Sequence, residues 1–318
     1  MASAGVGRAE IIKLATIAPE GSLWMQGMRK GADEIKQRTA GRVQIKLFGG
    51  GVMGSENSML RKIRVGQLHG GAFTAGGLSG VCSDLRIYGL PMVFRSFEEV
   101  DQVRSRMDKA LLAALETAGF VSFGFGEGGF ALLMSHEPVR TLEDMKGKKV
   151  WIPADDRISE VAMKHLGLSP VVLPITDVLT GLQTGLLDIV ETSPIGAIAF
   201  QWHVKTRYIT DAPLAYLFAT LVIDKKVFDR LAAADRDIVR EVMTRIYAGF
   251  DRQNRADNQA AFEALIAQGL QVVQPPASEL SRWREKSALV NRSLEEEGAF
   301  NAALYRQMQG HLAEFRKR

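Results

Sequence analysis

The first third of the chain alternates between the two hydrophobic periods that distinguish strands from helices. Short apolar runs predict buried strands, and apolar residues spaced three or four positions apart predict helices between them. The predicted strands are 11–18, 43–48, 68–75 and 120–125, and the predicted helices begin at Ser22, Ser55 and Glu98. Because strand and helix alternate, this order favours a parallel sheet with right-handed crossovers.

The middle of the chain repeats this rhythm and predicts a second βα unit. The predicted strands are 148–153, 169–174 and 187–192, and the predicted helices are 158–166, 177–184 and 195–202. Residues 215–223 are apolar and β-branched, which predicts a long strand.

The last part of the chain changes to sustained helical spacing. Residues 234–268 keep this spacing without a proline, which predicts a helix about 50 Å long at about 1.5 Å per residue. A helix of that length exceeds the width of one domain, so we expect it to brace two. Residues 269–276 predict a short strand and a stop, and 278–317 predict further helix. The pattern therefore predicts an α/β clamshell of two hinged domains.

Composition and charge agree with an ordinary globular protein. Of the 318 residues, 46% are hydrophobic and 24% are charged. Lys plus Arg number 40 and Asp plus Glu number 36, and a net charge of +4 spread along the chain predicts no nucleic-acid partner. The single cysteine, Cys82, excludes an internal disulfide and a zinc site built from cysteines. No apolar run reaches the roughly 18 residues that a membrane span needs.

The first nine residues contain no apolar signal core. Two interpretations fit this start. The chain is either a cytoplasmic protein or a mature exported protein whose signal was replaced by a start Met.

The pattern G-x-G-x-x-G occurs twice, at Gly49, Gly51 and Gly54 and at Gly124, Gly126 and Gly129. The first copy lies between a predicted strand and a helix, as a dinucleotide-binding loop does. However, it follows the second strand, and no acidic residue closes a third strand at the required distance. A strand-like stretch follows the second copy, where a helix is needed. We therefore interpret both as turns or close backbone approaches.

No arrangement typical of catalysis or metal binding is present in the sequence. The five histidines form no ligand cluster, and the patterns of a nucleophile elbow and of a phosphate loop do not occur. We predict no catalytic residue, no cofactor and no metal.

Polar and aromatic residues stand instead at the ends of predicted strands. In open α/β sheets, ligands gather at the carboxyl ends of the strands, so these residues predict a cleft between two βα domains. The candidate ligand-binding residues are Pro19, Glu20, Thr74, Glu127, Phe130, Trp151, Glu191, Thr192, Ser193 and Tyr216.

A series of short motifs resembles one family in order and in spacing. The motifs are Ala18-Pro19-Glu20-Gly21, Thr39-Ala40-Gly41-Arg42-Val43, Met53-Gly54, Gly66-Gln67-Leu68, Leu90-Pro91-Met92-Val93-Phe94, Thr141-Leu142-Glu143-Asp144-Met145-Lys146-Gly147-Lys148-Lys149-Val150 and Leu182-Gln183-Thr184-Gly185-Leu186-Leu187-Asp188. Together they resemble the DctP-type solute receptors of tripartite ATP-independent periplasmic (TRAP) transporters. The match runs from about residue 11 to the long helix and beyond.

The resemblance implies a two-domain clamshell with three hinge segments and no catalysis. It implies a periplasmic protein that delivers a small solute to the small and large membrane subunits of the transporter. The sequence leaves the oligomeric state open, and we favour a monomer. We place the first domain at residues 10–125 plus 213–250 and the second at 126–212 plus 251–318.

The chain departs from this family where the ligand is expected to bind. Members that bind organic acids typically carry an Arg at the position of Trp151, a second Arg at that of Ala131 and often an Asn at that of Thr192. An Arg fork is the natural partner of a carboxylate, and tryptophan offers only one N–H donor and an apolar face. We expect a ligand with an apolar or aromatic face or a cationic centre, with Glu127 and Glu191 favouring a cation or accepting hydroxyl hydrogen bonds. The rival expectation is that Arg157 swings in and restores anion binding.

Two other functions stay open at this point. The chain can be a cytoplasmic nucleotide-dependent α/β enzyme that uses one of its glycine loops. It can also be an extracytoplasmic sensor partner with the same fold.

Overall fold

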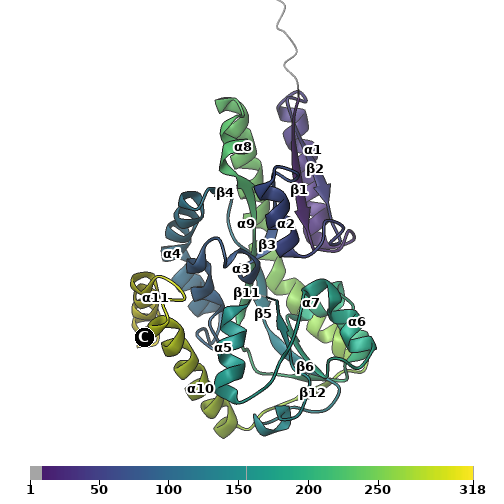
Figure 1. The fold of residues 1–318 in the computed structure, drawn as a ribbon, viewed down its shortest axis with the longest axis vertical. Helices are drawn as coiled ribbons and strands as arrows, with labels where there is room; N and C mark the ends of the chain where they lie inside the picture. The colour runs from purple at the N-terminus through teal and green to yellow at the C-terminus, as the bar shows by residue number, and fades with distance from the viewer. Residues whose placement is uncertain (1–8, 155, 318) are drawn as a thin grey trace, which may run out of the picture.

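Strand and helix alternate in the structure where the sequence predicts them (Figure 1). The structure is a computed structural model that describes residues 9–154 and 156–317. The first elements are β1 (Glu10–Thr16), α1 (Leu23–Arg38), β2 (Val43–Phe48), α2 (Glu56–Arg64) and β3 (Gly70–Thr74). Ser22 and Ser55 cap α1 and α2, since each hydroxyl accepts a hydrogen bond from a backbone N–H three residues on. Residues 1–8, on which the expectation of a replaced export signal rests, lie outside the described residues.

The larger sheet has the order β2-β1-β3-β11-β4, with β5 also paired to β11. Its later strands are β4 (Phe120–Ser122), β5 (Gly126–Phe130) and β11 (Tyr216–Asp224). β1 is parallel to β2 and to β3, as predicted. β11 is antiparallel to β3, β4 and β5, so the sheet is mixed and not purely parallel. The difference arises because β11 returns to this sheet from the second half of the chain.

The smaller sheet has the order β12-β10-β6-β9, and β7 and β8 form a separate parallel pair. The strands are β6 (Leu132–Ser135), β7 (Trp151–Pro153), β8 (Val171–Leu173), β9 (Ile189–Thr192), β10 (Tyr208–Thr210) and β12 (Gln271–Val273). The helices of this part are α5 (Arg157–Leu166), α6 (Val178–Gln183) and α7 (Pro194–Ala199). β10 was not predicted because three residues are too few to show an alternation.

The long helix α9 (Ala233–Ala267) has 35 residues and braces both sheets, as predicted (Figure 1). In its first half, Val242 and Met243 pack in the core of the larger sheet with Ile12 and Leu14. In its second half, Leu265 packs in the core of the smaller sheet. α1 approaches the first half closely, because a Cβ added at its Gly27 would lie 2.7 Å from the Phe250 ring.

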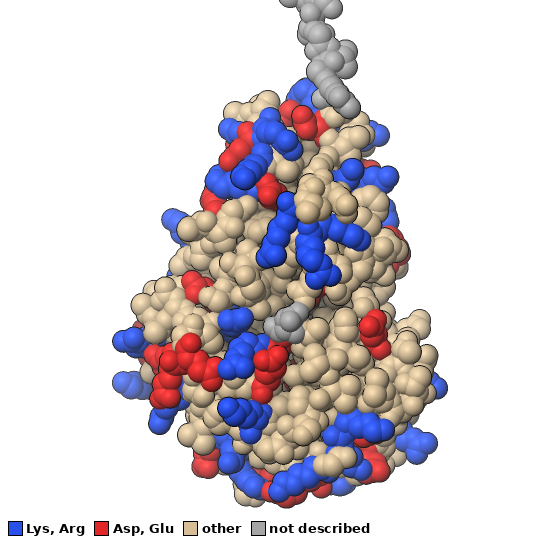
Figure 2. All heavy atoms as spheres, viewed as in Figure 1, with Lys and Arg blue, Asp and Glu red and all other residues tan. Residues whose placement is uncertain are grey.

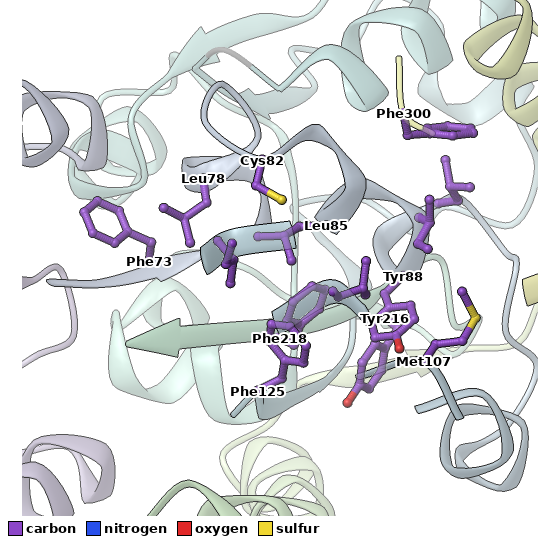
Figure 3. Packing of buried hydrophobic residues seen from close by; sticks show 14 of the residues in the cluster. Phe73, Leu78, Cys82, Leu85, Tyr88, Met107, Phe125, Tyr216, Phe218 and Phe300 are labelled. Carbon is purple, nitrogen blue, oxygen red and sulfur yellow. The ribbon is translucent and has the colours of Figure 1, made fainter. Parts of the chain in front are cut away.

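A second core in the larger body is rich in aromatic rings (Figure 3). Tyr88 and Phe125 each pack edge-to-face on Phe218, with ring centroids 5.6 and 5.2 Å apart. Tyr216 stacks on the same Phe218 at 6.1 Å. Cys82 is a buried free thiol in this cluster.

The C-terminal helices are α10 (Ala277–Glu296) and α11 (Ala302–Phe315). α10 packs against α5, whereas α11 turns back onto α4 (Phe97–Thr117) and adds Met308 and Leu312 to the aromatic core. We expected a first domain of residues 10–125 plus 213–250 and a second of residues 126–212 plus 251–318. Two elements of the expected second domain belong instead to the larger body. β5 pairs within the larger sheet, and α11 packs on the larger body.

The remaining short helices connect these elements. They are α3 (Ala75–Leu78), α8 (Lys225–Asp229) and the 3-10 turns η1 (Ser83–Gly89), η2 (Glu143–Met145), η3 (Ile175–Asp177) and η4 (Trp202–Lys205).

The second G-x-G-x-x-G stretch leads into β5 and forms part of it, so it makes no loop before a helix. Its Gly129 has a φ of +89°, and a Cβ there would lie 2.7 Å from the Asn258 amide nitrogen. Close approach to α9 therefore accounts for this glycine.

The surface in Figure 2 carries basic and acidic side chains interspersed, with a local gathering of basic ones near α2. The last turn of α2 holds Arg61, Lys62 and Arg64. Among the residues that the structure describes, no helix combines the length and the apolar character that crossing a bilayer requires.

Candidate ligand-binding cleft

A cavity of about 830 Å³ lies between the two sheets. Residues at or just after the carboxyl ends of β1, β3, β7, β8 and β9 line it. The start of β11 and residues of α5, α7 and α10 complete the wall. Strand ends from both bodies thus converge on one space, as the sequence predicted for a ligand site.

All but two of the candidate residues line this cavity. They are Pro19, Thr74, Glu127, Trp151, Glu191, Thr192, Ser193 and Tyr216. Glu20 does not contribute, because its exposed carboxylate pairs with Arg29 and accepts a hydrogen bond from the Gly49 backbone. Phe130 does not contribute either, because its ring packs on Phe97 at 4.9 Å.

Trp151 is a buried wall residue of the cavity, with 4% of its surface exposed. Its indole N–H donates to the Leu173 carbonyl at 2.9 Å. Its ring meets the Trp202 ring edge-to-face, with centroids 5.1 Å apart. Because the N–H is already used, Trp151 offers the cavity only the apolar surface of its ring. Trp151 is thus both a core residue of the smaller body and a wall of the cavity.

Glu127 lines the cavity, but its charge is already compensated. Its buried carboxylate accepts hydrogen bonds from Arg255 at 2.9 Å and from the Tyr216 hydroxyl at 3.3 Å. The expectation that Glu127 favours a cationic ligand is therefore wrong in this structure. The reason is a guanidinium that stands 128 residues further along the chain.

Glu127 belongs to a larger set of interlinked charges beside the cavity. Arg104 of α4 donates to the Tyr216 hydroxyl at 3.0 Å and pairs with Asp108 at 3.0 Å and with Asp251 at 2.8 Å. Burial raises the pKa of Asp108 and of Tyr216. We call Arg104, Asp108, Glu127, Tyr216, Asp251 and Arg255 the paired cluster.

Three other carboxyl groups of the lining, those of Glu56, Asp156 and Glu191, form no ion pair with a described residue, and we call Glu56 and Glu191 the cleft carboxyls. Glu191, near the end of β9, forms no hydrogen bond or ion pair through its side chain with any described residue. Burial, with a smaller contribution from the negative charge of Asp156, raises its pKa to about 7.

Glu56 begins α2 and stands at the wall formed by the larger body. Its carboxyl accepts hydrogen bonds from the Thr74 N–H at 2.6 Å and from the Thr74 hydroxyl at 2.9 Å. Burial nevertheless raises the pKa of Glu56 to about 7. Thr74 therefore has two roles in the site, since it orients the Glu56 carboxyl and also lines the cavity.

The basic side chains of the lining are Arg86 and Lys286. Arg86 donates to the Ala299 carbonyl at 2.6 Å, and burial lowers its pKa, against the opposing effect of Asp156. Arg157 is exposed, lies outside the lining and pairs with Glu297 at 2.5 Å. In this structure Arg157 lies away from the cavity, and the rival expectation that it swings in to bind an anion stays a prediction.

Sequence reasoning missed Glu56, Arg86 and Trp202. Glu56 carried one available signal, since it follows a glycine loop and a helix N-cap at the expected edge of the sheet. Arg86 and Trp202 lie in 3-10 turns that only the tertiary fold brings to the cavity. In residues 9–154 and 156–317, no group of His, Cys, Asp and Glu side chains is arranged to hold a metal ion.

Residues 14–297 match the profile of the bacterial extracellular solute-binding proteins, family 7, or DctP. The chain is 23% identical to the C4-dicarboxylate-binding periplasmic protein DctP of Rhodobacter capsulatus, over 86% of this chain and 83% of that protein.

Solved structures share the fold of almost the whole chain. A TRAP periplasmic solute-binding protein from Xanthobacter autotrophicus with bound β-D-galacturonate has a TM-score of 0.86 and 22% identity, covering 95% of this chain and 99% of the other. One from Ochrobactrum anthropi, whose C-terminus is bound in its ligand-binding pocket, has a TM-score of 0.81 and 26% identity, covering 98% and 97%. These similarities confirm the predicted two-domain fold with its long bracing helix.

Proposed function

The chain belongs to family 7 of the bacterial extracellular solute-binding proteins, and on that premise we propose that it is the solute receptor of a TRAP transporter. One observation carries the proposal, namely the cavity of about 830 Å³ that strand ends of both bodies enclose. This volume lies within the range of roughly 300–1,000 Å³ that is usual for small-molecule sites. The receptor captures its solute there and performs no chemical reaction on it.

Capture and closure are coupled in this proposal because the two walls belong to different bodies. Thr74 and Tyr216 belong to the larger sheet, and Trp151 and Glu191 belong to the smaller body. A solute that contacts both walls binds the closed form more tightly than the open one, and so shifts the population toward closure. The chain crosses between the bodies from β5 to β6, from β10 to β11 and along α9, and these crossings serve as the hinges.

The partners of the receptor follow from the same premise. In the closed form, the receptor presents one combined surface to the small and large membrane subunits, and it works in the periplasm as a monomer. The solute passes from the cleft to these subunits when the two bodies separate.

The test measures binding and closure together. A native extract is passed over the protein, retained solutes are identified by mass spectrometry, and each is tested by thermal shift and small-angle scattering. A solute at one hundred times its Kd stabilises the folded state by about 2.7 kcal/mol, and the radius of gyration decreases. ATP and NAD are expected to leave the melting temperature unchanged, whereas an increase would favour a nucleotide-dependent enzyme.

A cavity-filling variant assigns the binding to this cleft. Ala199 lines the cavity and is only partly buried, so Ala199→Trp is expected to abolish both responses. Ala260 is exposed on α9, and Ala260→Trp provides a matched control that should bind normally. Retained binding in the Ala199 variant would place the site elsewhere.

A further inference from the structure

The lining of the cavity distinguishes between classes of solute, and this step rests on the proposed receptor function. Its walls are largely apolar, and rings of Trp151, Phe200, Trp202 and Tyr216 contribute to them. The acidic lining residues are Glu56, Glu127, Asp156 and Glu191, and the basic ones are Arg86 and Lys286. The cavity therefore combines aromatic surface with an excess of carboxyl groups.

The acids of the lining differ in how far the protein itself satisfies them. Arg255 neutralises Glu127, and Asp156 accepts hydrogen bonds from the Ile158 N–H and the Ser159 hydroxyl. Glu56 has hydrogen-bond donors but no basic partner, and Glu191 has neither among the described residues. The carboxyl oxygens of Glu56 and Glu191 can therefore accept further hydrogen bonds, and the donor groups for these come from the solute.

The basic groups of the lining do not reproduce a carboxylate-binding fork. Arg86 directs Nη1 to the Ala299 carbonyl and its Nε is buried without a partner, so it offers a solute Nη2 and not a two-nitrogen fork. The indole N–H of Trp151 is used by Leu173. Lys286 remains as a single ammonium group, a point charge without the planar fork that an arginine offers to a carboxylate.

We propose that the solute is an organic amine, a cation on an apolar or aromatic body, held between the cleft carboxyls Glu56 and Glu191. The ammonium group supplies the donors that Glu191 lacks and compensates its charge. The apolar body packs on the rings of the wall, where a cation near an aromatic face gains further attraction. The two carboxyls stand on different bodies, so an amine that contacts both also holds the cleft closed.

Binding of a cation is expected to depend on pH in a defined direction. A cation favours the ionised carboxyl, and the pKa of Glu191 is about 7, so affinity should rise as the pH increases from about 5 to about 8. Asp156 is the charged group that acts on Glu191, and Glu56, Glu127, Arg86 and Lys286 are the other charged groups of the lining.

The experiment compares three probes that share one apolar body: naphthylethylamine, naphthylethanol and naphthylacetate. Their affinities for the full chain are measured by isothermal titration at several pH values. We expect the amine to bind at least tenfold more tightly than the alcohol or the acid. Equal or tighter binding of the alcohol or the acid overturns the proposal.

Substitutions locate the effect at the proposed carboxyls. Glu191→Gln should weaken amine binding at least tenfold and flatten its rise with pH, without weakening binding of the alcohol. Glu285 is exposed on α10, and Glu285→Gln should leave all three affinities unchanged. Glu56→Gln is the second variant, with the same expectation as Glu191→Gln, if the first does not fold. An unchanged amine affinity in the folded variant contradicts the assignment.

The outcomes separate this inference from the receptor function. If naphthylacetate or an organic acid from the native extract binds and closes the cleft, the amine proposal fails and the receptor function stands. If neither the probes nor any component of the extract binds, both fail.

Discussion

Two sets of carboxyl groups lie in or beside the same cavity, and the protein treats them in opposite ways. In the paired cluster, Glu127 accepts hydrogen bonds from Arg255 and from Tyr216, and Asp108 and Asp251 share Arg104 as their basic partner. Among the cleft carboxyls, Glu191 has no partner among the described residues, and Glu56 has only Thr74. Glu127 and Glu191 both lie on strands and both line the cavity, so position alone does not explain the difference.

The difference follows from where each set lies relative to the hinges. The paired cluster joins α4 of the larger body to β5, β11 and α9, along which the chain crosses between the two bodies. In the proposed receptor, pairing there holds the geometry of the crossing when the cleft opens and closes. The cleft carboxyls face the cavity in which we propose that the solute binds, so their partner does not need to come from the protein. In this proposal the partly buried Glu191 is left without a partner because the solute supplies it, whereas the paired acids stabilise the fold.

The largest expected effect comes from breaking the paired cluster at its centre. Arg104→Met removes the donors to Tyr216, Asp108 and Asp251 and leaves two partly buried carboxylates without their basic partner. Losing one partner of a buried pair typically costs about 3–5 kcal/mol of unfolding free energy, measurable by urea denaturation. Arg106→Met on the exposed face of α4 is the matched control and should cost less than about 1 kcal/mol. Equal losses in both variants would contradict the structural role.

The substitution of Glu by Gln can be made both in the paired cluster and among the cleft carboxyls. Glu127→Gln places an amide N–H₂ group against the donors of Arg255 and Tyr216. Such a mismatch inside a buried network costs about 1–3 kcal/mol, so the urea midpoint should fall. A Glu127→Gln variant as stable as the unchanged protein would mean that the carboxylate of Glu127 is not needed by its neighbours.

The elements that sequence reasoning located were those whose signal is local. The long helix was predicted at 234–268 and runs over Ala233–Ala267, because 35 residues of unbroken periodicity leave no alternative. Strand ends were also located well enough that eight of the ten candidate residues line the cavity. The pairing state of each acid was not predictable, because Arg255 reaches Glu127 only through the tertiary fold. The sequence therefore predicts which polar residues stand at a strand end, but not whether the protein itself already pairs them.

Replacing Glu by Gln among the cleft carboxyls should change stability in the opposite direction from Glu127→Gln. The ordinary pKa of a glutamate is 4.5 and that of Glu191 in the folded protein is about 7, so folding takes up a proton between these values. The Glu191 carboxyl therefore lowers the free energy of unfolding progressively as the pH rises through this window. At pH values above the window the whole loss of stability is present. Glu191→Gln should stabilise the protein by about 1 kcal/mol or more at about pH 8 and have little effect at about pH 4. Thermal melts at both pH values measure this, and a destabilised variant at the higher pH would place Glu191 with the paired acids.

The smallest expected effect concerns Arg157, the residue that would have to move if the cleft bound anions. Its guanidinium is about half exposed and pairs with Glu297 and Glu160 on the surface, outside the cavity lining. Exposed pairs contribute about 0–1 kcal/mol, so Arg157→Ala should change the unfolding free energy by less than about 1 kcal/mol. It should also leave the affinity for naphthylethylamine within about twofold, or roughly 0.4 kcal/mol, since no contact with the solute is lost. A loss of solute binding in this variant, with Glu191→Gln binding normally, would move the recognition charge from the cleft carboxyls to a mobile arginine and so reverse the comparison between the two sets.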